Sequence, residues 1–135
     1  MNITTSFLHI GVTCKNPKVF VDFYSNYFGF KRVKTIIAAN GKEIVFIKDE
    51  NNTCLEIFEA EENRPVEKPV LDGPHYSGWK HIAFLVESID DKLAEIGTDT
   101  VITLGPKTLN ESGWRAVWIK DTEGNIIELT EGYTE

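Results

Sequence analysis

One segment of the chain reads Val45-Phe-Ile-Lys-Asp-Glu-Asn-Asn-Thr-Cys-Leu-Glu-Ile57, and a later segment reads Val117-Trp-Ile-Lys-Asp-Thr-Glu-Gly-Asn-Ile-Ile-Glu-Leu129. Aligned without a gap, at an offset of 117 − 45 = 72 residues, the two share Val, Ile, Lys, Asp and Glu. Their remaining apolar positions mostly match in character. Self-similarity at a fixed offset is the signature of a repeated structural unit, so we interpret the chain as an internal duplication.

A histidine and a glutamate recur at the same offset. His9 aligns with His81 (81 − 9 = 72) and Glu56 aligns with Glu128 (128 − 56 = 72). Each copy therefore separates its histidine from its glutamate by 47 residues (56 − 9 and 128 − 81). Chance could produce one short match, but it would rarely preserve a histidine and a glutamate at both ends of a copy. The equal spacing makes these four residues candidates for a shared function.

Each copy is predicted to begin with a strand followed by a helix. In the first copy, residues 7–14 are rich in β-branched and aromatic residues and show no helical period. Asn16 and Pro17 form a typical helix start, an N-cap before a proline at the first helical position, and Gly29 suits the C-terminal end. In the second copy, residues 79–86 form the strand, Ser88 caps the helix and Gly97 ends it.

Three further strands are predicted in each copy. In the first copy, one strand ends at about residue 39 and two more run from 43 to 48 and from 53 to 59. Asn40-Gly41 is a hairpin signal between the first two of these strands. In the second copy a turn at residues 121–124 joins the last two strands. Residues 61–77 form a linker because they are rich in turn-forming residues, namely Pro65, Pro69, Gly73 and Pro74. We therefore predict one α+β domain, residues 1–135. It contains two tandem β-α-β-β-β modules, at about 5–60 and 78–132, with helices on the outer faces of two small sheets.

The composition favours a folded domain that binds a small molecule. A chain of 135 residues with 41% hydrophobic residues suits one domain with a real core. A net charge of −7 argues against nucleic acid or an anionic membrane as partner. No apolar run approaches the roughly 20 residues of a membrane span, and the N-terminal residues lack a secretion signal. Cys14 and Cys54 show no CxxC spacing, so we expect reduced, buried thiols in a cytoplasmic protein.

Strand alternation indicates how the four candidate residues could bind a metal ion. His9 and His81 lie in the first predicted strand of each copy, and the two glutamates lie in the last. Because successive strand side chains point to opposite faces, His9 shares a face with Gly11 and Thr13. If the copies pair about a pseudo-twofold axis, two imidazoles and two carboxylates meet at the floor of one cleft. That ligand set suits zinc, nickel, cobalt, manganese or iron(II), with positions left open for a substrate.

Four segments carry a resemblance to a known family. They are Leu8-His9-Ile10-Gly11-Val12, the stretch from Phe23-Tyr24 to Gly29-Phe30, His81-Ile82-Ala83-Phe84, and Asp121-Thr-Glu-Gly-Asn-Ile-Ile-Glu128. Over nearly its whole length the chain resembles the vicinal oxygen chelate superfamily, which includes glyoxalase I, bleomycin-resistance proteins and extradiol dioxygenases. The ligand pattern is most similar to glyoxalase I (lactoylglutathione lyase)-like proteins, whose His, Glu, His and Glu positions are all present here.

The resemblance implies a metal-dependent lyase or isomerase of the glyoxalase I type, acting on a small-molecule substrate, and a homodimer. In such a reaction the metal stabilises an enediolate while Glu56 or Glu128 acts as the proton-transfer base. Phe46 and Trp118, at equivalent places in the repeat, and Arg115 are the expected substrate contacts. The chain lacks the arginine expected near His9 for glutathione, so another thiol adduct, an acyl-CoA or a small keto acid are the open substrate classes.

Relatives with other chemistries supply the alternatives. An iron(II) extradiol-type dioxygenase would use His9, His81 and Glu128, although Glu56 would then occupy a coordination position needed for catechol or oxygen. A drug-sequestering resistance protein would bind its ligand in the same cleft without a metal, yet such relatives lack the full ligand set. A thiol transferase acting on fosfomycin is a further relative, but the acidic C-terminal residues lack the cation cluster that a phosphonate requires.

Overall fold

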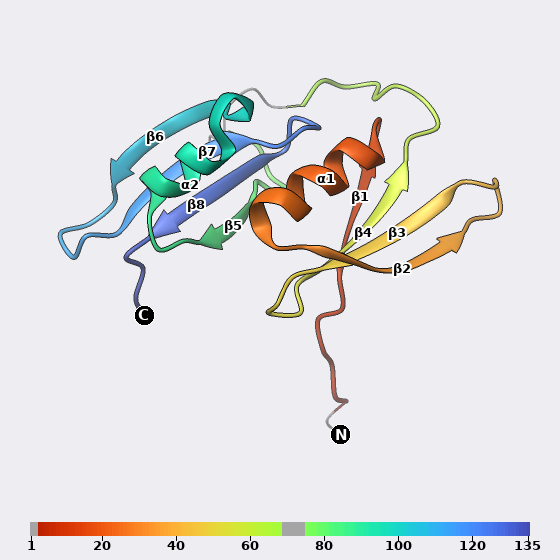
Figure 1. The fold of residues 1–135 in the computed structure, drawn as a ribbon, viewed down its shortest axis with the longest axis horizontal. Helices are drawn as coiled ribbons and strands as arrows, with labels where there is room; N and C mark the ends of the chain where they lie inside the picture. The colour runs from red at the N-terminus through yellow and green to blue at the C-terminus, as the bar shows by residue number, and fades with distance from the viewer. Residues whose placement is uncertain (1–2, 69–74) are drawn as a thin grey trace. The chain divides into compact units, whose positions relative to one another are not determined.

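The computed structural model describes residues 3–68 and 75–135, and it divides the chain into two units, Met1–Asn63 and Arg64–Glu135 (Figure 1). The division falls inside the stretch predicted as a linker. Pro69, Gly73 and Pro74 of that stretch lie outside the described residues. Each unit is therefore considered by itself.

The first unit contains one helix and a four-stranded mixed sheet. Its elements are β1 (Ile10–Cys14), α1 (Pro17–Phe28), β2 (Lys31–Ile37), β3 (Glu43–Lys48) and β4 (Cys54–Glu59). The strands lie in the order β1-β4-β3-β2, with β1 parallel to β4 and the other neighbours antiparallel. The first and last strands of the unit are thus hydrogen-bonded neighbours.

The second unit repeats this plan. It contains β5 (Ile82–Leu85), α2 (Ile89–Ile96), a 3₁₀ turn at Gly97–Asp99, β6 (Ile102–Thr108), β7 (Arg115–Lys120) and β8 (Ile126–Glu131). The strand order is β5-β8-β7-β6, and β5 again runs parallel to β8. The predicted α+β fold of two β-α-β-β-β modules is confirmed, with the 3₁₀ turn as an addition that the sequence did not indicate.

Local signals set the ends of the helices. The Asn16 side chain accepts a hydrogen bond from Val19 N at 3.2 Å, which satisfies one of the unpaired donors of the first turn of α1. Gly29 ends the helix in the left-handed region, at φ 71°, where a residue without Cβ is not strained. Ser88 caps α2 in the same way, through Asp91 N at 3.1 Å. The predicted caps are therefore confirmed.

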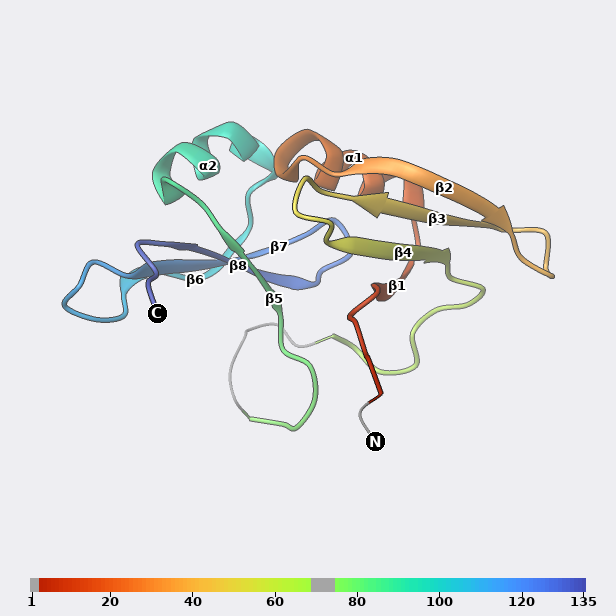
Figure 2. The same ribbon diagram turned by 90° about the horizontal axis from the view of Figure 1, so that it is seen from below.

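The core of each unit lies between its helix and one face of its sheet (Figure 2). α1 contacts β1 and β4, and α2 contacts β8. The sheet residues on the helix-facing side are almost fully buried: Val45, Ile47, Leu55 and Ile57 in the first unit, and Val117, Ile119, Ile127 and Leu129 in the second. Full burial of one such side chain stabilises the folded state by about 1.5–3 kcal/mol. Because strand side chains alternate, these buried residues fix which face of each sheet packs against the helix and which face carries the other side chains.

The first strand of each unit is shorter than predicted. β1 begins at Ile10 rather than residue 7, and β5 covers Ile82–Leu85 rather than residues 79–86. Ile10 pairs with Leu55, one residue after β4 begins, so β1 has almost no partner strand before that point. The β-branched and aromatic composition predicted longer strands, but the residues ahead of β1 and β5 are not paired in the sheets. Phe7, Leu8 and Trp79 are exposed.

Two further expectations concern the thiols and the membrane. Cys14 and Cys54 are both buried thiols, as predicted. Among the described residues, no helix has the length and apolar character needed to cross a bilayer.

Candidate metal centre

The first histidine–glutamate pair is built by the parallel neighbours β1 and β4. The strand register places Gly11 beside Glu56, and His9 lies two residues before Gly11, just ahead of β1. Because side chains alternate, His9 and Glu56 lie on the face that α1 does not cover. His9 Nε2 is 3.1 Å from Glu56 Oε1, and the two side chains are 27% and 19% exposed. These two candidate residues therefore lie in contact on one face of the sheet.

The second pair repeats the first at equivalent positions. The register places Ala83 beside Glu128, and His81 lies two residues before Ala83, just ahead of β5. His81 Nε2 is 3.8 Å from Glu128 Oε1, with side chains 22% and 14% exposed. Both pairs are therefore half-buried, which keeps them accessible while their carboxylates are partly removed from water.

Aromatic side chains surround the first pair. Phe46 lies opposite Glu56 on β3, and its ring meets the His9 ring edge-on, with centroids 5.9 Å apart. A Cβ placed on Gly11 would lie 3.7 Å from Glu56 Oε1 and 3.8 Å from the Phe58 ring. The carboxylate of Glu56 therefore lies beside the backbone of Gly11, with the Phe46 ring against its partner histidine.

Different side chains neighbour the second pair. Trp118 lies opposite Glu128 on β7, and Lys107 Nζ lies 5.4 Å from the centroid of the indole ring. The indole nitrogen of Trp118 is buried and, among the described residues, has no hydrogen-bond partner. Ala116 and Ile126 cluster with the indole ring. This face of the second sheet thus carries the indole N–H of Trp118 on the strand next to Glu128, without a hydrogen-bond partner among the described residues.

Three residues near the pairs were not singled out from the sequence. Phe58 and Thr130 occupy equivalent positions (130 − 58 = 72), each two residues after a candidate glutamate and hence on the same face. Thr130 accepts a hydrogen bond from Trp114 Nε1. Strand alternation would have identified both residues, whereas Lys107 depends on the bulged pairing of β6 with β7, which the sequence does not reveal.

Arg115 lies away from the second pair. It pairs with Glu131 in the register of β7 and β8, on the face opposite that of Trp118 and Glu128. Its guanidinium lies 2.5 Å from Glu131 Oε1, and Glu131 Oε2 accepts a hydrogen bond from Ile89 N at the start of α2. The structure brings Phe46 and Trp118 to the candidate glutamates but places the expected substrate contact Arg115 beside the helix.

The donor atoms suit a divalent metal ion. Two ligand atoms that are each about 2.1 Å from one ion lie about 3.0–3.4 Å apart at ordinary coordination angles. The 3.1 Å separation in the first pair matches this value, and the 3.8 Å separation in the second is slightly longer. Among the described residues, neither pair gains a third His, Cys, Asp or Glu within its own unit. Each unit by itself therefore contributes two candidate ligands.

Known proteins share this fold. The fosfomycin resistance protein FosX from Listeria monocytogenes matches with a TM-score of 0.70 and 16% identity, covering 97% of this chain and 96% of that one. A glyoxalase family protein from Bacillus cereus matches with a TM-score of 0.79 and 14% identity, covering 98% and 97%. A glyoxalase/dioxygenase from Nostoc punctiforme matches with a TM-score of 0.71 and 20% identity, covering 98% and 100%. Among curated proteins no match is found.

A family model extends the likeness to the sequence itself. The model of the Glyoxalase/Bleomycin resistance protein/Dioxygenase superfamily matches residues 6–129, which include both histidine–glutamate pairs. The resemblance inferred from the sequence is confirmed at the level of this superfamily, without a specific link to glyoxalase I. The chain belongs to the Glyoxalase/Bleomycin resistance protein/Dioxygenase superfamily.

Proposed function

We propose that this protein is a divalent-metal-dependent lyase or isomerase of the glyoxalase I type, active as a homodimer on a small-molecule substrate. The observation that carries the proposal is the repetition of one histidine–glutamate pair at equivalent positions of two units. His9, Glu56, His81 and Glu128 are the proposed ligands of a single ion. A lone histidine–glutamate contact could be structural, but duplication without loss of either residue favours a shared chemical role.

The donor set narrows the choice of metal ion. Imidazole and carboxylate ligands suit zinc, nickel, cobalt and manganese, and a related FosX structure contains Mn(II). When bound, the ion would polarise a substrate carbonyl and stabilise the enediolate that forms when a neighbouring C–H loses its proton. Iron(II) in the purified protein would instead favour the dioxygenase alternative.

Glu128 is the proposed proton-transfer base. Its carboxylate lies 3.8 Å from its histidine, against 3.1 Å for Glu56, so the contact that it would give up on turning toward a substrate is the longer of the two. Trp118 beside it offers an N–H donor that has no partner among the described residues. Glu128 would remove a proton from the carbon next to the substrate carbonyl and return it to the neighbouring atom. Glu56 would remain a ligand throughout.

The test measures binding of an enediolate mimic to proteins whose metal content is first verified by elemental analysis, because Glu128 is proposed both as a ligand and as the base. Protein loaded with Zn, Ni, Co or Mn would be titrated calorimetrically with a hydroxamate that mimics a cis-enediolate, alongside Glu128→Gln and Glu56→Gln. We expect tight binding only with metal, and at least about tenfold weaker binding in Glu128→Gln, because the mimic's acidic proton loses its acceptor. The proposal fails if the loaded protein binds the mimic no better than Glu128→Gln does.

A further inference from the structure

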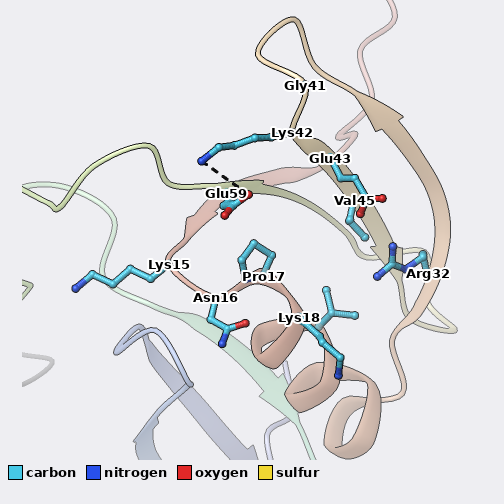
Figure 3. A pocket seen from close by; sticks show the side chains of 11 residues that line it. Lys15, Asn16, Pro17, Lys18, Arg32, Gly41, Lys42, Glu43, Val45 and Glu59 are labelled. Carbon is cyan, nitrogen blue, oxygen red and sulfur yellow. Dashed lines mark ion pairs between the residues drawn. The ribbon is translucent and has the colours of Figure 1, made fainter.

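A separate pocket lies in the first unit, between the start of α1 and strands β2 and β3 (Figure 3). Its volume is about 490 Å³, which falls within the range of small-molecule sites, roughly 300–1,000 Å³. Val21 of α1 and Val45 of β3 form part of its apolar lining. The pocket therefore has the size and partly apolar wall of a ligand site.

The pocket lies on the opposite face of the sheet from the first histidine–glutamate pair. Val45 lines the pocket, whereas the next residue, Phe46, lies beside Glu56. Successive strand residues point to opposite faces, so the sheet itself separates this pocket from His9 and Glu56. A ligand bound here would not contact the proposed metal ligands of its own unit.

Positive charge dominates the pocket lining. Lys15, Lys18, Arg32 and Lys42 contribute four cations from three separate segments, against two carboxylates, Glu43 and Glu59. The chain as a whole carries a net charge of −7, so this local excess runs against the general composition. An anion is therefore the ligand that the pocket's electrostatics favour.

Part of this charge is available to a ligand. Arg32 makes a 3.3 Å hydrogen bond to the neutral hydroxyl of Thr35, and no carboxylate among the described residues forms an ion pair with it. Lys42 Nζ is 3.8 Å from Glu59 Oε2, a loose contact visible in Figure 3. Lys18 pairs with Asp22, outside the pocket, with both side chains exposed. Exposed pairs of this kind contribute little to stability, so a more highly charged anion can displace them.

We propose that this pocket binds a small molecule carrying a phosphate or diphosphate group. Four cations around one pocket favour an anion with more than one negative charge, and the planar guanidinium of Arg32 can donate two hydrogen bonds to phosphate oxygens. The first turn of α1 carries no acidic residue that would repel such a group. Pro17, Val21 and Val45 provide the apolar surface for the remainder of the ligand.

Inorganic pyrophosphate is the probe for the test. The ¹⁵N-labelled full chain, freed of divalent ions because pyrophosphate chelates them, would be titrated at constant ionic strength and followed by amide chemical shifts. We expect saturable shifts centred on the pocket lining, with little change at His9 and Glu56. Citrate, an anion with carboxylates only, would bind at least about tenfold more weakly.

A matched pair of variants identifies the site. Arg32→Gln removes a pocket cation, whereas Lys34→Gln removes a cation from the same strand that does not line the pocket. We expect Arg32→Gln and Lys42→Gln each to weaken pyrophosphate binding by about tenfold or more, and Lys34→Gln by less than about twofold. The proposal is overturned if millimolar pyrophosphate produces no saturable shifts, or if the shifts centre on His9 or His81. It is also overturned if Arg32→Gln and Lys34→Gln weaken pyrophosphate binding equally, or if citrate binds as tightly as pyrophosphate. Dispersed spectra of each variant verify that it is folded.

Discussion

Trp118 lies directly opposite Glu128 on the neighbouring strand, and its indole N–H is buried without a hydrogen-bond partner among the described residues. A buried donor that makes no hydrogen bond costs about 1–3 kcal/mol. Such groups are rare in folded proteins and often mark a place where a ligand or water completes the structure. The indole N–H is therefore a candidate donor to a substrate oxygen held beside Glu128.

The first prediction compares two tryptophans. Trp114 donates a hydrogen bond to Thr130, whereas Trp118 has no partner among the described residues. We expect Trp118→Phe to lower the free energy of unfolding less than Trp114→Phe does, with a difference of about 1 kcal/mol, because only the latter loses a hydrogen bond. Urea denaturation measures both values. Burial alone gives the opposite order, since Trp118 is the more buried of the two, so a larger loss in Trp118→Phe contradicts the prediction.

The second prediction concerns metal content. Protein purified anaerobically without an affinity tag is expected to contain about one divalent ion per chain, and His81→Ala and His9→Ala are each expected to lose it, because each removes one of four ligands. Elemental analysis is the measurement. His75→Ala is the control, since His75 is exposed and lies outside both pairs. Retention of metal by His81→Ala, or its absence from the parent protein after reloading, would refute the four-ligand centre.

The third prediction concerns Gly11, which lies beside Glu56. A Cβ on Gly11 would meet Glu56 Oε1 at 3.7 Å, an ordinary contact, and the second unit already carries Ala83 at the equivalent position. Gly11→Ala is therefore expected to bind metal within about twofold of the parent protein. Gly11→Leu adds bulk that meets the carboxylate of Glu56, so we expect at least about tenfold weaker metal binding.

The corresponding measurement is a competition titration with a chromophoric chelator. Ala83→Gly serves as the control at the equivalent position, where removing a methyl group leaves Glu128 undisturbed. Equal metal affinities of Gly11→Ala and Gly11→Leu would show that Glu56 is not a ligand in the geometry described.

The fourth prediction assigns Arg115 a structural role. Its ion pair with Glu131 joins β7 to β8, and Glu131 in turn accepts a hydrogen bond from the start of α2. We expect Arg115→Met to lower the free energy of unfolding by about 1–2 kcal/mol, because Glu131 is mostly buried and loses its partner. Metal content and binding of the enediolate mimic are expected to stay unchanged. Weaker binding of the mimic with unchanged stability would instead make Arg115 a substrate contact.

The sequence contained most of the information needed for the local structure. Asn16 and Gly29 predicted the ends of α1 because helix caps depend on the backbone preferences of single residues. The fixed offset of 72 residues predicted two similar units and paired each histidine with a glutamate. Boundaries that depend on a partner strand were less well predicted, as the short β1 shows.

The sequence by itself determined the fold class, the duplication and the four candidate ligands, because caps, turns and strand alternation act over a few residues and the duplication repeats them. Only the tertiary structure decided that Arg115 faces α2, that Lys107 lies over Trp118 and that four cations from three segments line one pocket. Those relationships depend on strand register and on bulges between distant segments, and a shift of one residue exchanges the two faces of a strand.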